Sequence, residues 1–519
     1  MNRDGANVSL WQQDIPNYQS VNQFQANKIY DVLIVGAGIT GVTTAFLLQQ
    51  AGRSCLLVEA HNPGFGTTGG TTAHLNTMLD TPYNEIESDF GKDNAKLVAQ
   101  ATASAIQLVE KLTRHYHIDC DFSYQDGYIY SQDKKQTKEL DKIFAASERA
   151  GIPIAYTDNI PVPVSFEKAV RFAGQAQFHP TKFITSLLQE FERKGGVVLS
   201  NCLVQKVEEK DELVNAQTSR GLMRARQLVY ATHLPPGVND FSFKCAPYRS
   251  YVVAFAAPDS QPLDALVYDL EEPYHYFRTQ SLNGTDYLIV GGADHKTGHE
   301  EHPEKSFLVL ESYVKKLYGV NKVDFKWSSQ FFEPVDGLPY IGKMPRSENL
   351  YVATGFSGNG ITLGIVSALV LHDLLVNGES IYEKVFDATR IKPLASLGTF
   401  LKEQADVVGA FVGKRLNVQK IEALTALAPG EGAIVKYEGE KIALYKDEKG
   451  GVHALNPVCP HAKCFVAWNS TEKSWDCPCH GSRFDVEGRI LTGPVMHELK
   501  KIDLASLSEE EPEQRRGSR

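Results

Sequence analysis

The chain has 519 residues, of which 42% are hydrophobic, 10% aromatic and 22% charged. This length predicts two or three domains, and the composition excludes a disordered chain, a collagen-like chain and a single small module. The 53 Lys and Arg residues against 63 Asp and Glu give a net charge of −10, and no long basic run occurs. No nucleic-acid partner is therefore expected.

Neither an export signal nor a membrane span is expected. Residues 1–13 are polar and contain no apolar signal core and no twin-arginine pair, which predicts a cytoplasmic protein. The longest apolar stretch, 361–376, contains Thr362, Ser367, His372 and Asp373. Its length and polarity argue against a bilayer helix.

The predicted elements begin after a polar arm over residues 1–28. Strands over 30–35 and 54–59 enclose a helix over 41–50, which is a βαβ unit. The later pattern predicts helices over 95–116, 135–150, 181–194, 307–318 and 361–376, and strands over 127–131, 197–207, 226–231, 247–257, 286–292 and 350–353. A helical connector is expected over 396–415, and a domain of short strands over 416–507. The charged segment 508–519 predicts a disordered tail.

A glycine-rich turn joins the first strand to the first helix. Gly36, Gly38 and Gly41 form a GxGxxG pattern, and Glu59 ends the second strand. The glycines permit the tight turn, the approach of a pyrophosphate to the backbone and the packing of helix on strand, while Glu59 can accept from ribose hydroxyls. The pattern predicts a dinucleotide site and leaves both FAD and NAD open.

Further motifs decide between these two dinucleotides. They lie at 66–70, at 178–180, at 228–232, at 336–339 and at 353–360. In this order they resemble the D-amino-acid oxidase-like family of FAD-dependent oxidoreductases, from about residue 30 to about residue 382. The resemblance implies FAD and an α/β Rossmann-like FAD-binding domain with an α+β substrate domain, together spanning 29–395. The FAD-binding parts are expected near 29–80, 175–245 and 328–390. The implied FAD contacts are Gly36, Gly38, Gly41, Glu59, Thr67, Thr68, Gly355, Gly358, Asn359, Gly360, Ile361 and Thr362.

The same resemblance raises questions about individual side chains. His233 replaces a glycine that is more usual in the second nucleotide motif, and His74 lies where some relatives attach flavin covalently, although an ordinary histidine is the alternative. Tyr276 and Arg278 are candidate catalytic or substrate contacts, the arginine because it can hold a carboxylate, with surface ion pairing as the alternative. The close spacing of His295, His299 and His302 leaves a metal site or a plain polar loop.

Four of the eight cysteines lie between residues 459 and 479. Clustered cysteines in a cytoplasmic chain indicate a metal before a disulfide framework. Cys459 and His461 form Cys-x-His, and Cys477 and His480 form Cys-x-x-His. The pattern resembles the all-β Rieske domain, whose [2Fe–2S] cluster has two cysteine and two histidine ligands. Zinc is the competitor, but its first ligand pair is usually more widely spaced.

The Rieske resemblance also implies roles for neighbouring residues. Cys464 and Cys479 match a pair that forms a disulfide between cluster loops in cytochrome bc-type complexes, with two free thiols as the alternative. Ser482 matches a hydroxyl donor to a cluster sulfur, whereas Phe484 replaces a tyrosine of high-potential members. Because hydrogen bonds to sulfur favour the reduced cluster, we expect a lowered potential.

A flavin site and a one-electron cluster in one chain predict an FAD-dependent oxidoreductase. The expected substrate is an amine or amino acid, and electrons would pass singly through the cluster to an unknown external acceptor. No second GxGxxG follows Glu59, which argues against an NADH-fed reductase. No two-histidine, one-carboxylate iron site is evident, which argues against a Rieske oxygenase. The alternative is a non-catalytic electron-transfer or redox-sensing protein that docks to a partner.

Overall fold

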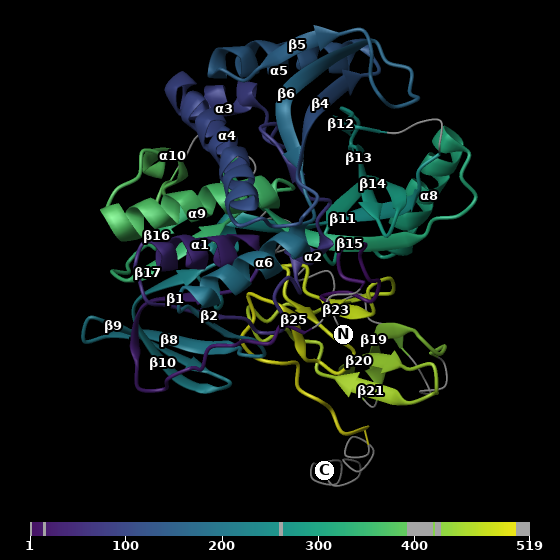
Figure 1. The fold of residues 1–519 in the computed structure, drawn as a ribbon. Coiled ribbons are helices and arrows are strands. Elements are labelled where there is room, and N and C mark those ends of the chain that lie inside the picture. Colours follow the sequence, from purple (N-terminus) through teal and green to yellow (C-terminus); the bar gives the residue numbers. More distant parts are fainter. Residues whose placement is uncertain are drawn as a thin grey trace, which may run out of the picture.

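A computed structural model describes residues 3–13, 17–258, 263–391, 427–437 and 439–504, with the backbone alone of 419–420 (Figure 1). The expected connector 396–415 and tail 508–519 lie outside the described residues. The polar arm at the N-terminus does not stand apart from the fold, because Arg3, Asp4, Leu10 and Trp11 are each 1% exposed.

The first βαβ unit belongs to an eight-stranded sheet in the order β16-β17-β10-β1-β2-β7, in which β17, β10, β1, β2 and β7 are parallel. Strands β8 and β9 continue antiparallel from β10. Helices α1, α6 and α9 pack on one face, and the β8–β10 layer covers the other (Figure 1). The bounds are β1 (Ile29–Val35), α1 (Ile39–Gln50), β2 (Cys55–Val58), α6 (Pro180–Arg193), β7 (Val197–Leu199), β8 (Val204–Lys210), β9 (Leu213–Thr218), β10 (Gly221–Tyr230), β16 (Tyr340–Lys343), β17 (Leu350–Thr354) and α9 (Gly360–Asn377). The strand expected over 197–207 is thus two strands.

A second sheet of nine strands has the order β15-β11-β14-β13-β12-β4-β6-β3, with β5 paired to β6. Helix α8 packs beside β11 and β14, and α3, α4 and α5 lie over β4 to β6 (Figure 1). The bounds are α2 (Thr67–Gly70), β3 (His74–Leu75), α3 (Tyr83–Phe90), α4 (Lys92–His115), β4 (Ser123–Ser131), α5 (Lys134–Ala150), β5 (Ile154–Thr157), β6 (Lys168–Gln177), α7 (Phe241–Lys244), β11 (Cys245–Ala256), β12 (Ala265–Tyr268), β13 (Tyr276–Leu282), β14 (Thr285–Lys296), α8 (Glu304–Tyr318), β15 (Phe325–Pro334) and α10 (Glu383–Phe386).

The C-terminal region is built from two four-stranded sheets, as its short strands and turns predict. The first contains β18 (Gln419–Lys420), β19 (Gly432–Tyr437), β20 (Glu440–Lys446) and β21 (Val452–Leu455). The second contains β22 (Ala467–Asn469), β23 (Ser474–Asp476), β24 (Arg483–Phe484) and β25 (Ile490–Thr492). In Figure 1 this region lies directly against the two larger sheets, and the N-terminus lies beside it.

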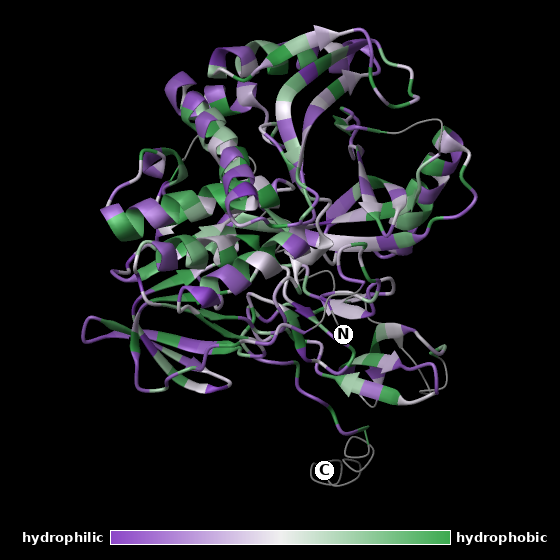
Figure 2. Ribbon diagram, in the orientation of Figure 1, coloured by the Kyte–Doolittle hydropathy of each residue, from purple (hydrophilic) through white to green (hydrophobic). Residues whose placement is uncertain are grey.

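Helix α9 is apolar on nearly every side and is coloured mostly green in Figure 2. By length and composition alone its 18 residues could cross a membrane, so the length and polarity of 361–376 are not enough to argue against a span. Most of the helix is nevertheless buried inside the fold, against α1, α4 and the parallel sheet. A core helix passes the same test, so this feature is weak evidence for a span.

Candidate functional site

The GxGxxG turn lines a long cavity that runs from Glu59 to the second sheet. Gly36 has φ +105, and an added Cβ would lie 2.4 Å from the Ala231 carbonyl oxygen. A Cβ on Gly41 would lie 1.8 Å from the Gly36 oxygen, so only glycine lets α1 pack this closely. The turn therefore has the form that the dinucleotide prediction requires.

The acid and hydroxyl groups expected at this end are also gathered there. The Glu59 carboxylate accepts from the Ala37 N–H at 2.8 Å and the His61 N–H at 2.9 Å. A carboxylate offers about four acceptor positions, so acceptors remain for ribose hydroxyls. Thr68 accepts from the Ile39 N–H, and both Thr67 and Thr68 line the cavity.

The start of α9 forms the middle of the cavity. Gly358, Asn359, Gly360 and Ile361 line it, and the first N–H groups of a helix have no partner within the helix. These donors and the helix dipole suit an electron-rich ring. Gly355 and Thr362 do not line the cavity, because Gly355 packs on Pro334 and Cys245, and the Thr362 hydroxyl accepts from the Asn76 N–H.

Polar and aromatic side chains form the far end of the cavity, and sequence reasoning missed all of them except His74. They are His74, Asp80, Ser250, Tyr268, Tyr274 and Asp294, and they surround the predicted residue Tyr276. The Tyr276 hydroxyl lies 2.8 Å from the Ser250 hydroxyl. Asp80 accepts from the Gly358 N–H at 2.6 Å, which joins this end to the start of α9.

The four predicted cluster ligands come together on two loops of the C-terminal region. Cys459 and Cys477 are buried free thiols, and the rings of His461 and His480 lie 4.9 Å apart. No ring nitrogen of either histidine has a hydrogen-bond partner among the described residues, although all four are buried. Burial lowers the pKa of both imidazoles, that of His480 to about 4, so both are neutral ligands at pH 7. Two thiols and two unpartnered neutral imidazoles fit a Rieske cluster.

The histidine side of this ligand set faces the nucleotide-binding part of the chain. The Phe243 ring lies 5.7 Å from the His480 ring, and the Gly237 N–H donates to the Pro494 carbonyl at 2.8 Å. Gln330, which lines the cavity, donates from Nε2 to the Gly481 carbonyl at 2.8 Å. Segment 490–493 and Val495 form part of the cavity wall itself. One surface thus joins the two sites.

Comparison with known proteins agrees with this geometry. The model of a family described as FAD dependent oxidoreductase matches residues 31–374, and the Rieske [2Fe-2S] domain model matches residues 417–503. The chain belongs to the FAD-dependent oxidoreductases and carries a C-terminal Rieske domain.

Individual relatives cover different parts of this FAD-dependent oxidoreductase. YhfW of Bacillus subtilis, whose name describes a Rieske 2Fe-2S iron-sulfur protein, is 30% identical over 95% of this chain and 96% of its own. The gamma-glutamylputrescine oxidoreductase of Escherichia coli is 22% identical over 66% of this chain and 83% of its own. The crystal structure of glycine oxidase from Geobacillus kaustophilus shares the fold, with a TM-score of 0.59 at 19% identity over 70% of this chain and 99% of that one.

The family assignment fixes the two cofactors. The oxidoreductase domain binds FAD, and the Rieske domain binds a [2Fe–2S] cluster. The turn at Gly36 and the start of α9 would hold FAD, which supplies two-electron chemistry when bound. Cys459, His461, Cys477 and His480 would hold the cluster.

Arg278 does not have the expected role in this oxidoreductase. It is 0% exposed and does not line the cavity. Its guanidinium donates to the carbonyls of Thr72 at 3.0 Å and Ala73 at 2.9 Å, and it lies over the Trp11 ring. The structure corrects the prediction of a substrate contact, because these donors already hold the loop before β3.

The structure shows the local contacts of the remaining histidines. His233 has φ +70, the conformation usually reserved for glycine, and its ring packs edge-on against Phe332. His74 lines the cavity and bonds to the Tyr268 hydroxyl; covalent attachment of flavin there stays a prediction. The structure gathers no metal site from His295, His299 and His302 within its described residues. These histidines contact Tyr251, Pro478 and Glu304, respectively.

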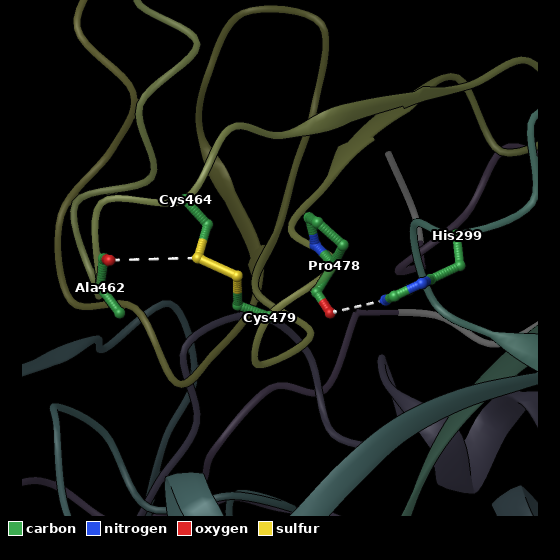
Figure 3. The surroundings of a disulfide bond; sticks show 5 residues. All are labelled: His299, Ala462, Cys464, Pro478 and Cys479. Atoms are coloured by element: carbon green, nitrogen blue, oxygen red, sulfur yellow. Dashed lines mark hydrogen bonds between the residues drawn. A yellow bond between two sulfur atoms is a disulfide. The ribbon is translucent and has the colours of Figure 1, made fainter. Parts of the chain in front are cut away.

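The Rieske loops are linked by the expected disulfide between Cys464 and Cys479 (Figure 3). The Rieske loop that contains Cys479 also contacts the oxidoreductase part, where His299 Nε2 lies 3.3 Å from the Pro478 carbonyl oxygen. Cys464, Cys477 and Cys479 lie within 4.8 Å of one another, but the disulfide removes two of them as ligands. Cys477 remains for the iron.

Ser482 is positioned to tune the cluster. Its hydroxyl is buried with no hydrogen-bond partner among the described residues, and the neighbouring Cys477 and Ser482 side chains lower the pKa of the Cys459 thiol. Phe484 is fully buried beside the ligand cysteines and cannot add a second hydroxyl. We expect Ser482→Ala to lower the reduction potential by roughly 40 mV, the equivalent of about 1 kcal/mol of hydrogen-bond energy. Protein-film voltammetry measures the shift, and an unchanged potential would contradict this role.

The raised pKa of Asp294 lowers the stability of the folded protein at neutral and higher pH. Burial raises its pKa to about 7, a hydrogen bond with Ser250 opposes this shift, and the charge of Asp80 adds to it. A carboxyl with a raised folded-state pKa loses stability as the pH rises from its unfolded value near 4 to about 7. We expect Asp294→Asn to stabilise the protein at pH 8 by about 2 kcal/mol. The gain should shrink at pH 5 in urea unfolding; an equal gain at both pH values would contradict the shift.

Proposed function

We propose that this protein oxidises an amine or amino acid at its FAD and delivers the electrons one at a time through the Rieske cluster to an external acceptor. The substrate C–H bond next to nitrogen breaks with its hydrogen and electron pair passing to FAD, and water hydrolyses the resulting imine. The two electrons leave separately by way of the cluster, and the protons go to solvent.

The observation that carries this proposal is the surface shared by the two sites. Gln330 is part of the cavity wall, and its side chain donates to Gly481, the residue after the cluster ligand His480. The Thr67 hydroxyl donates to the Gln330 carbonyl at 2.8 Å from the other side. A short, packed connection of this kind supports electron exchange within one chain.

A second observation supports a fixed rather than a transient contact. Asp4 and Arg483 are each no more than 1% exposed; Arg483 donates to the Asp4 carbonyl oxygen and lies 3.4 Å from its carboxylate. Glu472 of the Rieske domain accepts from the Ala6 N–H at 2.9 Å and from Ser328 on β15. The N-terminal arm thus lies between the domains and bonds to both.

The alternative function is non-catalytic electron transfer or redox sensing. It predicts cofactors that change redox state with a partner protein but no turnover of small amines. The tyrosines and aspartates at the far end of the cavity favour an enzyme, because they place polar groups in a pocket beside the start of α9.

Steady-state assays distinguish the two functions. Purified holoprotein is incubated with a panel of amines and amino acids and with ferricyanide as one-electron acceptor. We expect turnover with at least one member of the panel, and two ferricyanides reduced per substrate oxidised. If no member of the panel bleaches the flavin or the cluster, the result favours the redox-sensing alternative.

A further inference from the structure

The cavity is poor in positive charge. Among the residues that the structure describes, no lysine or arginine lines it, whereas Asp4, Glu59, Asp80 and Asp294 do. The lining histidines do not compensate. Burial lowers the pKa of His61, His74 and His233, and the neighbouring Arg278 lowers that of His74 further, so all three are neutral at pH 7. A buried carboxylate on the substrate would find no cation to pair with.

Two of the four acids already have partners far from the substrate end. Asp4 is paired with Arg3 and Arg483, and Glu59 accepts two backbone N–H groups at the dinucleotide turn. Asp80 and Asp294 remain, and both belong to the far end of the cavity. The Oδ1 atom of Asp294 is buried without a hydrogen-bond partner among the described residues. A buried acceptor of this kind calls for a donor that the protein does not supply.

The aromatic rings beside these acids suit a positive charge as well. The ring centroids of Tyr274 and Tyr276 lie 5.6 Å apart. The His74 ring packs edge-on against Tyr268 and Tyr276, with centroid distances of 5.2 and 5.8 Å. Tyrosine faces attract cations, and more strongly where water is excluded. Arg278, which lies near this end, points its donors at the Thr72 and Ala73 carbonyls instead.

We propose that the substrate is a cationic amine without an α-carboxylate, bound with its ammonium group between Asp294 and Asp80 and against the tyrosine rings. This inference rests on the proposed function and narrows it, since α-amino acids become poor substrates. Asp294 is the main ammonium partner, because its free oxygen needs a donor. Asp80 adds negative charge and ties the pocket to Gly358 at the start of α9.

Matched pairs of ligands test the inference on the complete holoenzyme. Each pair is an α-amino acid, in both enantiomers, and the amine that has hydrogen in place of its carboxyl group: phenylalanine and phenethylamine, 2-aminobutyrate and propylamine, ornithine and putrescine. Dissociation constants come from the change in the visible flavin spectrum without oxygen, and stopped-flow absorbance gives the rate of flavin bleaching. Within the pair that binds best, we expect the amine to bind about 100-fold more tightly or better.

Variants assign the effect to the acids. We expect Asp294→Asn to weaken amine binding about 100-fold and to leave amino-acid binding unchanged. The control is Asp286→Asn, on the same strand but exposed and bonded to Ser281, which should bind amines as the parent does. Flavin content and the Rieske electron paramagnetic resonance signal verify folding, and Asp80→Asn is the second variant if Asp294→Asn does not fold.

The outcomes separate this inference from the proposed function. Tighter binding and faster bleaching with amino acids than with amines would overturn the inference and leave amine or amino-acid oxidation standing. Unchanged amine binding in both aspartate variants would also overturn it. If neither ligand class bleaches the flavin, the proposed function fails and this inference fails with it.

Discussion

Replacing Cys477 with serine is expected to abolish the cluster while FAD remains bound. Cys477 is a fully buried ligand on the Rieske loop, whereas the glycine turn and the start of α9 belong to the oxidoreductase part. Iron analysis should fall from about two atoms per chain to none. Flavin bleaching by substrate should stay near the parent rate, and reoxidation by the natural acceptor should drop to a small residual fraction.

The matched control for this variant is Cys120→Ser, which changes a buried free cysteine in the connection between α4 and β4. It should keep the iron, the paramagnetic signal and the reoxidation rate. A Cys477→Ser protein whose flavin is reduced and reoxidised at the parent rates would remove the cluster from the electron route. The cluster would then have a structural or sensing role.

The second large effect is expected at the charge cluster that joins the domains, which consists of Arg3, Asp4, Arg249, Glu472, Asp476 and Arg483, all buried. Arg483 binds Asp476 at 3.0 Å and Asp4 at 3.4 Å. Burial opposes ionisation of both acids, but the surrounding guanidiniums outweigh it and lower each pKa. Arg483→Met would remove the guanidinium bound to Asp476 and one of the two that pair with Asp4, and should destabilise the Rieske domain by about 3–5 kcal/mol.

Urea unfolding followed by the visible circular dichroism of the cluster measures this loss. Arg489→Met is the control, because Arg489 forms a 2.8 Å ion pair with Asp485 in the same domain but is 64% exposed. It should cost less than about 1 kcal/mol. Equal effects of the two variants would show that the buried cluster contributes no more than a surface ion pair. Because the pKa values of Asp4 and Asp476 are lowered in the folded protein, their stabilisation is present above the ordinary carboxyl pKa. It is lost as the pH falls through the folded pKa values.

The parts of the molecule that the sequence predicts well are those whose chemistry is local. The spacing of Gly36, Gly38 and Gly41 is a property of one turn, so the βαβ unit can be placed without knowing the rest of the fold. The cluster ligands lie on two loops only 15 residues apart, and their residue types already specify the chemistry. Most of the predicted strands and helices lie within a few residues of observed ones, but 197–207 is two strands, and β6, β9, β13 and β15 were not predicted.

The parts that were wrong or missed depend on distant partners. Arg3 and Asp4 look like a solvated arm, but they are buried because their partners are the Ser328 carbonyl on β15 and Arg483 in the Rieske domain. The role of Arg278 as a substrate contact was inferred from its residue type. Only the fold shows that carbonyls of the 71–74 loop occupy its donors. Asp80 and Asp294 meet because the nine-stranded sheet brings a loop and a late strand together. The sequence signal for Asp294 was its position directly after the apolar run 288–293.

A single anaerobic turnover of the holoenzyme tests the central claim most directly. Substrate is mixed with fully oxidised protein, flavin absorbance is followed by stopped flow, and the reduced Rieske signal is followed by rapid-freeze paramagnetic resonance at several protein concentrations. The account predicts that the cluster is reduced after the flavin, without added mediator, at a rate that does not depend on protein concentration. A cluster that stays oxidised, or whose reduction rate rises in proportion to protein concentration, would contradict electron transfer within the chain.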